Sequence, residues 1–149
     1  VQRNELRWEE EMTEDAELLL VAFGTVGRIC KSVLRSARRA GLKVGLLRPI
    51  SLWPFPDQRL YELAGQVQQM LVVEMNAGQM LLDVQAAVRG RAPVRFYGRM
   101  GGIVPLPDEI SEQIDKLMTL PASLPETDRP GNGYHRHAAA TAVASRPRA

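Results

Sequence analysis

The sequence has few of the side chains that usually carry chemistry: one cysteine, Cys30, and two histidines in 149 residues. One cysteine cannot form an internal disulfide or hold an iron–sulfur cluster, which needs several thiolates. The histidines, His135 and His137, lie near the end of the chain, so the rest of it cannot supply a Ser-His-Asp or Cys-His set. We do not expect this His-Arg-His run to bind a metal. A reduced, cytoplasmic setting is expected.

Long apolar runs are also missing. No stretch of about 18 apolar residues is present, so the sequence predicts no membrane-spanning helix. The chain starts at Val1 inside a polar segment without a signal-peptide pattern, which we interpret as the start of a fragment or a downstream domain. Apolar residues make up 45% of the sequence, enough for the core of one ordinary domain.

Charge is distributed unevenly. Residues 1–15 carry six acidic and two basic side chains, whereas residues 28–48 carry seven basic side chains and no acidic one. The basic block is predicted on one helix face, not along a groove with aromatic residues, so nucleic acid is not an expected partner. Two interpretations of this basic face stay open, a simply solvated surface and a contact with an acidic partner surface.

Apolar runs alternate with amphipathic segments along the chain, which predicts an α/β fold with a mostly parallel sheet and helices on both faces. Residues 4–12 predict an exposed edge strand because charged residues flank Leu6 and Trp8. The predicted strands are 4–12, 17–23, 43–47, 70–73 and 93–97, and the predicted helices are 27–40, 58–67, 79–88 and 107–120.

Glycine, proline and aspartate mark the expected element boundaries. Gly24 to Gly27 is predicted as a turn before the first helix, and Gly41 as the glycine that ends it. Asp57 is predicted to cap the second helix. The three prolines of residues 48–56 predict a stiff loop without ladder pairing.

We expect three regions along the chain: a linker and edge strand over residues 1–15, an α/β domain over 16–120, and a disordered tail over 121–149. The tail is rich in proline, alanine, glycine and arginine and has no apolar periodicity, so it cannot offset the entropy of ordering.

The stretch 72–80, VVEMNAGQM, has the pattern of a strand that delivers polar groups to the start of a helix. Glu74 fits a general base, but no second titratable residue accompanies it, so a salt bridge or the capping of a turn is the preferred interpretation. Asn76 is interpreted as the N-cap. Gln79 opens the helix.

Three further features are candidate contacts. The turn from Gly24 to Arg28 resembles an anion-binding turn and would act with Arg48, although the third glycine of a dinucleotide fingerprint is missing. Trp53 and Phe55 lie between prolines and either anchor a partner or cover the edge of the domain's own core.

Four ordered motifs together resemble one known family. The runs DAELLLVAFGTVGR (15–28), GLKVGLLRPISLWPFP (41–56), VVEMNAGQM (72–80) and FYGRMGGIVPLP (96–107) are similar to the C-terminal domain of the alpha subunit of 2-oxoacid:ferredoxin oxidoreductases. The resemblance covers roughly residues 4–118. It looks closest to the branched-chain 2-oxoisovalerate type, with the 2-oxoglutarate type next.

The resemblance implies a transketolase C-terminal-like fold: a three-layer α/β/α sandwich around a mostly parallel five-stranded sheet with one antiparallel edge strand, residues 4–12. It also implies a complex that converts a 2-oxoacid and CoA to acyl-CoA and CO2 with thiamine diphosphate, Mg and iron–sulfur clusters. This chain lacks the thiamine-diphosphate GDG signature and has one cysteine, so we expect it to bind none of these cofactors and to supply no catalytic or metal-binding residue.

The expected partners are the alpha N-terminal domain, the beta and gamma subunits and, through the complex, ferredoxin. A homodimer stays open, and neither nucleic acid nor membrane is expected. The alternatives are the C-terminal domain of a dehydrogenase E1 beta type enzyme and a free-standing anion- or nucleotide-binding module. The candidate interface and turn residues are Arg48, Trp53, Phe55, Glu74, Asn76, Gln79 and Arg99.

Overall fold

The computed structural model describes residues 6–76, 78–99 and 103–119. The predicted tail and the first residues of the predicted edge strand lie outside the described residues. Within the described ranges, none of the helices has both the length and the apolar character needed to cross a bilayer.

Strands and helices alternate as the sequence predicts. The elements are β1 (Trp8–Glu11), β2 (Leu18–Ala22), α1 (Gly24–Arg39), β3 (Val44–Pro49), α2 (Asp57–Ala64), β4 (Gln69–Glu74), α3 (Gln79–Val88), β5 (Val94–Gly98) and α4 (Pro107–Thr119). They form one five-stranded sheet in the order β1-β3-β2-β4-β5. Strands β2 to β5 pair in parallel, and β1 pairs antiparallel with β3 at one edge.

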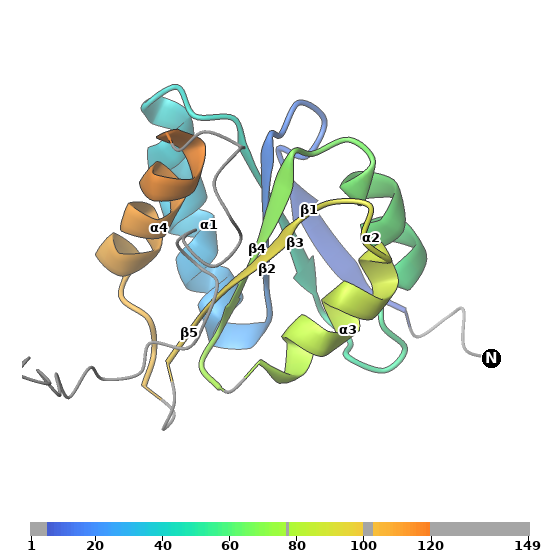
Figure 1. Cartoon of the computed structure of the whole chain (residues 1–149). Coiled ribbons are helices and arrows are strands. Elements are labelled where there is room, and N and C mark those ends of the chain that lie inside the picture. The colour runs from blue at the N-terminus through green and yellow to red at the C-terminus, as the bar shows by residue number, and fades with distance from the viewer. Residues whose placement is uncertain (1–5, 77, 100–102, 120–149) are drawn as a thin grey trace, which may run out of the picture.

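Helices cover both faces of the sheet because the central strand is apolar on both faces. All five residues of β2 are buried, and they alternate between two core clusters. Leu19 and Val21 pack with α2 and α3, whereas Leu18 and Leu20 pack with α1 and α4. Figure 1 shows these helix pairs on opposite sides of the sheet. The predicted three-layer α/β/α architecture with an antiparallel edge strand is confirmed.

One predicted loop begins too early. Arg48 and Pro49 belong to β3 and pair with Glu9 and Trp8 of β1, so the prediction of an unpaired loop from Arg48 was wrong at these two positions. Proline is tolerated here because it ends the strand, and the pairing of β3 with β2 stops at Leu47.

Two helix starts also differ from the prediction. Residues 24–27 form the first turn of α1, since the Gly27 N–H donates to the Phe23 carbonyl at 3.3 Å, and are not a separate turn. Asp57 is the first residue of α2 and makes no capping bond, because the N-cap position is Pro56. The predicted end of α1 is confirmed: Gly41 has φ +86°, and the Leu42 N–H donates to the Ala37 carbonyl at 3.0 Å, as in a Schellman motif.

The basic face of α1 has an acidic partner within the same chain. Lys31 pairs with Glu9 at 2.6 Å and Arg35 with Glu11 at 3.6 Å, both on β1. Arg38 binds both carboxylate oxygens of Asp15, at 2.7 and 3.0 Å. The acidic N-terminal segment and the basic helix, opposite in charge along the sequence, therefore lie against each other.

The other face of β1 is tied to α2 through Glu10. Arg59 on α2 donates to both carboxylate oxygens of Glu10, at 2.6 and 3.0 Å. Trp8 Nε1 and the Thr13 hydroxyl donate to the same carboxylate. The bonds from Arg59, followed in size by those from Trp8 and Thr13, lower the pKa of Glu10 to about 2 against the cost of burial. Alternate residues of β1 thus bind the helices on the two faces of the sheet.

We predict that Glu10→Gln lowers the free energy of unfolding at pH 7 by about 1–2 kcal/mol, a value that allows for solvent screening of a part-exposed pair. Because the folded-state pKa of Glu10 is depressed, this contribution is complete above pH 4.5 and is lost as the pH falls toward 2. The difference in free energy of unfolding between Glu10→Gln and wild type, measured with urea, should be smaller at pH 3 than at pH 7. Glu14→Gln, at an exposed position, is the control. An equal difference at both pH values would contradict the pairing.

Candidate functional site

The four parallel strands end at one edge of the sheet, at Ala22, Pro49, Glu74 and Gly98. We call this the carboxyl edge. It is where open α/β sheets place ligands and contacts. Three charged candidates from the sequence, Arg48, Glu74 and Arg99, lie at or next to these strand ends.

Glu74, the last residue of β4, holds the start of α3. Its Oε1 accepts the Met80 N–H at 2.8 Å and its Oε2 accepts the Leu81 N–H at 3.1 Å. Both are first-turn N–H groups that have no partner inside the helix. The sequence left two preferred interpretations of Glu74, a salt bridge and the capping of a turn. The structure shows the capping, and Glu74 forms no salt bridge among the described residues.

Asn76 supports the same turn but is not the N-cap. That position is Gly78, whose φ of +91° suits glycine. The Asn76 Oδ1 accepts the Gly78 N–H at 3.2 Å and, more weakly, the Gln79 N–H at 3.5 Å, which makes a side-chain turn just before the helix. The prediction of an Asn76 N-cap was wrong because the residue two positions later takes the left-handed conformation. The Gln79 side chain is exposed.

Burial raises the pKa of the Glu74 carboxyl, and the Met80 and Leu81 N–H bonds oppose that rise. The side chain is 6% exposed, and both its oxygens are used for capping. A general base needs a free oxygen within reach of a substrate proton. The geometry therefore fits a structural role for Glu74, the capping of α3, and not a role as a general base.

Arg48 lies across the start of α1. Its Nη1 is 3.2 Å from Glu9 Oε2, and its Nη2 is 3.4 Å from the Gly24 carbonyl. The stem of Arg48 fills the space over Gly27, where an added Cβ would lie 2.8 Å from Arg48 Cδ. The structure thus brings the glycine turn and Arg48 together, as the anion-binding alternative requires, but the arginine covers the turn and pairs with Glu9.

Arg99 belongs to a cluster that sequence reasoning missed. It pairs with Glu109 on α4, whose carboxylate also accepts the Tyr97 hydroxyl at 3.0 Å and the Leu106 N–H at 3.1 Å. Glu109 is the third residue of α4, so its bond to the residue before the helix is half of a capping box. The sequence pattern gives no clear signal for this bond, because Leu106 stands where a capping box has Ser or Thr.

The two aromatic candidates have separate positions. Phe55 is half-buried and packs against the core cluster under α2 and α3. Trp53 is 85% exposed. Covering the domain's own core is thus the structural role of Phe55, while Trp53 lies free at the carboxyl edge.

Cofactor chemistry finds little support in the described residues. They contain no group of three or more histidine, cysteine, aspartate or glutamate side chains that could hold a metal ion. Cys30 is buried, and burial raises the pKa of its thiol to about 12, so it stays protonated at neutral pH.

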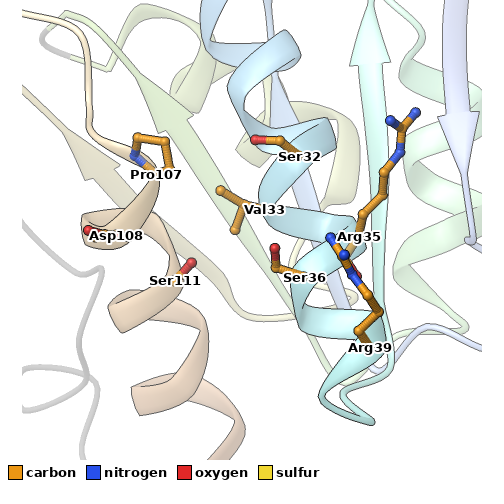
Figure 2. A pocket seen from close by; sticks show the side chains of 8 residues that line it. All are labelled: Ser32, Val33, Arg35, Ser36, Arg39, Pro107, Asp108 and Ser111. Atoms are coloured by element: carbon orange, nitrogen blue, oxygen red, sulfur yellow. The ribbon is translucent and has the colours of Figure 1, made fainter.

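A shallow groove of about 300 Å³ lies between α1 and α4. Figure 2 shows Ser32 and Ser36 on α1 facing Pro107 and Ser111 on α4. Most of its lining residues are exposed, and Arg35 extends away to Glu11. This lining describes a solvated surface groove and not a built ligand site.

Comparison with protein families gives a match over residues 16–110 to pyruvate:ferredoxin oxidoreductase core domain II. The chain belongs to this family. The core domain II match starts two residues before β2 and ends in the first turn of α4, so it includes the whole carboxyl edge except the β1 contacts.

Relatives and solved structures agree with the core domain II assignment. The ketoisovalerate oxidoreductase subunit VorB of Methanothermobacter marburgensis is 50% identical over 102 residues, 68% of this chain and 29% of VorB. A 2-oxoglutarate:ferredoxin oxidoreductase from Magnetococcus marinus matches at TM-score 0.68 and 22% identity, over 76% of this chain and 20% of that one. A split-gene transketolase, an inactive beta4 tetramer, matches at TM-score 0.63 and 15% identity, over 75% and 43%.

The two structural matches show the fold, and they confirm the predicted transketolase C-terminal-like class. The matched part of the chain spans less than a third of the length of VorB. Core domain II is therefore a part of a larger subunit in these relatives.

We predict that Glu74→Ala lowers the free energy of unfolding by about 2 kcal/mol, because it leaves two N–H groups of α3 without acceptors. Glu74→Gln keeps an acceptor oxygen and removes a buried charge, so its cost should stay below about 1 kcal/mol. Urea unfolding of both variants tests this, with Gln85→Ala, exposed on α3, as the control. Equal losses for Ala and Gln would show that the charge, and not the acceptor, matters.

The covered glycine turn yields a second prediction. Phosphate, ATP and CoA at millimolar concentration should leave the melting temperature unchanged, because Arg48 occupies the space over Gly27. A ligand at 100 times its Kd would add about 2.7 kcal/mol, or several degrees. A shift of that size, abolished by Arg48→Gln, would restore the anion-binding alternative.

Proposed function

We propose that this chain is a non-catalytic assembly domain of the alpha-type subunit of a thiamine-diphosphate-dependent 2-oxoacid:ferredoxin oxidoreductase. The reaction of the complex converts a 2-oxoacid, CoA and oxidised ferredoxin to acyl-CoA, CO2 and reduced ferredoxin. The observation that carries the proposal is the 50% identity to the VorB subunit, which covers 102 residues or 68% of this chain.

The geometry of the carboxyl edge supports the non-catalytic part of the proposal. Glu74 uses both oxygens to cap α3, Arg48 pairs with Glu9, and Arg99 pairs with Glu109. Each of these three groups already has a structural partner in the same chain. These groups hold the turns in place and leave no acid–base pair for a reaction.

The cofactors of such a complex would be bound elsewhere. The sequence has one cysteine and lacks the GDG signature of thiamine diphosphate sites, and the described residues bring no three His, Cys, Asp or Glu side chains together, which supports placing both groups in other domains or subunits. Partners would be the N-terminal domain of the same subunit and the beta and gamma subunits. The divisions at residues 15/16 and 120/121 stay predictions.

A branched-chain 2-oxoacid, 2-oxoisovalerate, is the proposed substrate class. The argument is similarity alone: VorB is named for ketoisovalerate and is 50% identical over 102 residues, whereas a 2-oxoglutarate synthase subunit, KorA of Methanothermobacter thermautotrophicus, is 36% identical over 109 residues. Substrate contacts would lie in domains outside this chain.

The proposal predicts that the chain alone reduces no acceptor with any 2-oxoacid and CoA. Together with the polypeptides encoded in the same gene and its neighbours, it should give CoA-dependent reduction of ferredoxin, fastest with 2-oxoisovalerate. The measurement compares 2-oxoisovalerate, 2-oxoglutarate and pyruvate with ferredoxin and with NAD as acceptors.

Each result bears on a different part of the proposal. Turnover by the chain alone would disprove the non-catalytic role. A complex that reduces only NAD would favour a dehydrogenase, and a complex inactive with every 2-oxoacid would disprove the enzyme class. A preference for 2-oxoglutarate would change the substrate alone.

A further inference from the structure

Exposed apolar side chains gather at the carboxyl edge. Nine large apolar side chains are exposed among the described residues, and six of them lie in the segments that follow β2, β3 and β5. We call these six the apolar rim: Phe23, Ile50, Leu52, Trp53, Ile103 and Leu106. The strand ends that carry them lie together at the bottom of the molecule in Figure 1. An exposed apolar group of this kind usually marks a contact surface.

Trp53, the most exposed member of the rim, stands on a braced loop. The Ile50 N–H donates to the Arg7 carbonyl at 2.9 Å, and the Ser51 hydroxyl donates to the Pro54 carbonyl at 2.9 Å. Phe55 anchors the far side of the loop on the core. The loop that carries the indole is therefore held before binding, which limits the ordering cost mainly to the Trp53 side chain and suits an anchor residue.

The charged side chains at the strand ends, Arg48, Glu74 and Arg99, have partners inside the chain, which indicates the chemistry of the partner surface there. Glu9 faces Arg48, Glu109 faces Arg99, and the first turn of α3 faces Glu74. A partner surface there needs no complementary charge and would meet aromatic and aliphatic groups. Depletion of charge and enrichment of aromatic residues are typical of the centre of a protein interface.

We propose that the apolar rim docks against an apolar surface of another part of the same oxidoreductase, with Trp53 inserted into it. The inference rests on the proposed function. The polypeptide needed to cover the rim exists in relatives, since the matched region spans 29% of VorB and the rest of that subunit lies outside it. Neither a second copy of this chain nor solvent is the proposed occupant.

The test uses the full chain, expressed with the polypeptides of its gene and neighbouring genes, and measures how much complex is recovered through a tag on this chain. Trp53→Glu should lower recovery about tenfold or more, whereas Trp53→Phe should keep it within about threefold of wild type. Met12→Glu is the matched control, because Met12 is 46% exposed at the opposite edge of the sheet, after β1. All three variants should unfold at the wild-type temperature, since both side chains are exposed.

Normal recovery with Trp53→Glu would overturn the inference, as would equal losses with Trp53→Glu and Met12→Glu. A second copy as occupant would overturn it too: sedimentation would then show a dimer of the chain alone that Trp53→Glu dissociates. A complex active on 2-oxoacids but indifferent to Trp53 removes this inference only. A Trp53-dependent complex without such activity removes the proposed function and keeps the docking surface. A wild-type chain that binds none of these polypeptides removes both.

Discussion

The burial of β2 on both faces is the constraint on which the rest of the structure depends. All five of its residues are buried, and neighbours along the strand enter different core clusters. Each fully buried aliphatic side chain contributes about 1.5–3 kcal/mol, so neither face can be left to water. Helices must therefore cover both faces, α1 and α4 on one and α2 and α3 on the other, and each parallel strand must turn into its helix at the same edge. The carboxyl edge, with its capping carboxylate and its apolar rim, is a consequence of that requirement.

The acidic residues of the N-terminal segment pair with cations of the same chain. Glu9, Glu11 and Asp15 bind the cations of α1, and Glu10 binds Arg59 of α2. The same holds for Arg48, Glu74 and Arg99 at the carboxyl edge. Individual surface ion pairs are weak, and here they add to the backbone pairing that holds β1 against β3. The outward-facing groups at the strand ends are then mostly apolar, which fits a domain that meets other protein surfaces and not a small charged substrate.

The sequence predicted most of what depends on local pattern. Periodicity placed α3 at Gln79–Val88, and the glycine rule placed Gly41 after α1. The errors have a long-range cause: β3 extends to Pro49 because β1, nearly forty residues earlier, pairs with it. The sequence also could not tell that Phe55 packs on the core while Trp53 is exposed. Both are aromatic residues in one loop, and only the folded structure decides which of them reaches the core. The role of Glu109 was missed because Leu106 lacks the capping side chain of a full capping box, and because its partners Tyr97 and Arg99 lie ten or more residues earlier.

The inward pairing of β1 has a consequence for anyone who shortens the chain. The family match starts at Ala16, so a version trimmed to it would lose Glu9, Glu11 and Asp15 together. Lys31, Arg35 and Arg38 would then face solvent on α1 beside Arg28 and Arg39. Such a cationic stripe attracts polyanions. RNA carried through purification of the trimmed protein, visible as a raised absorbance at 260 nm, would be an artefact of trimming and not a sign of nucleic-acid recognition.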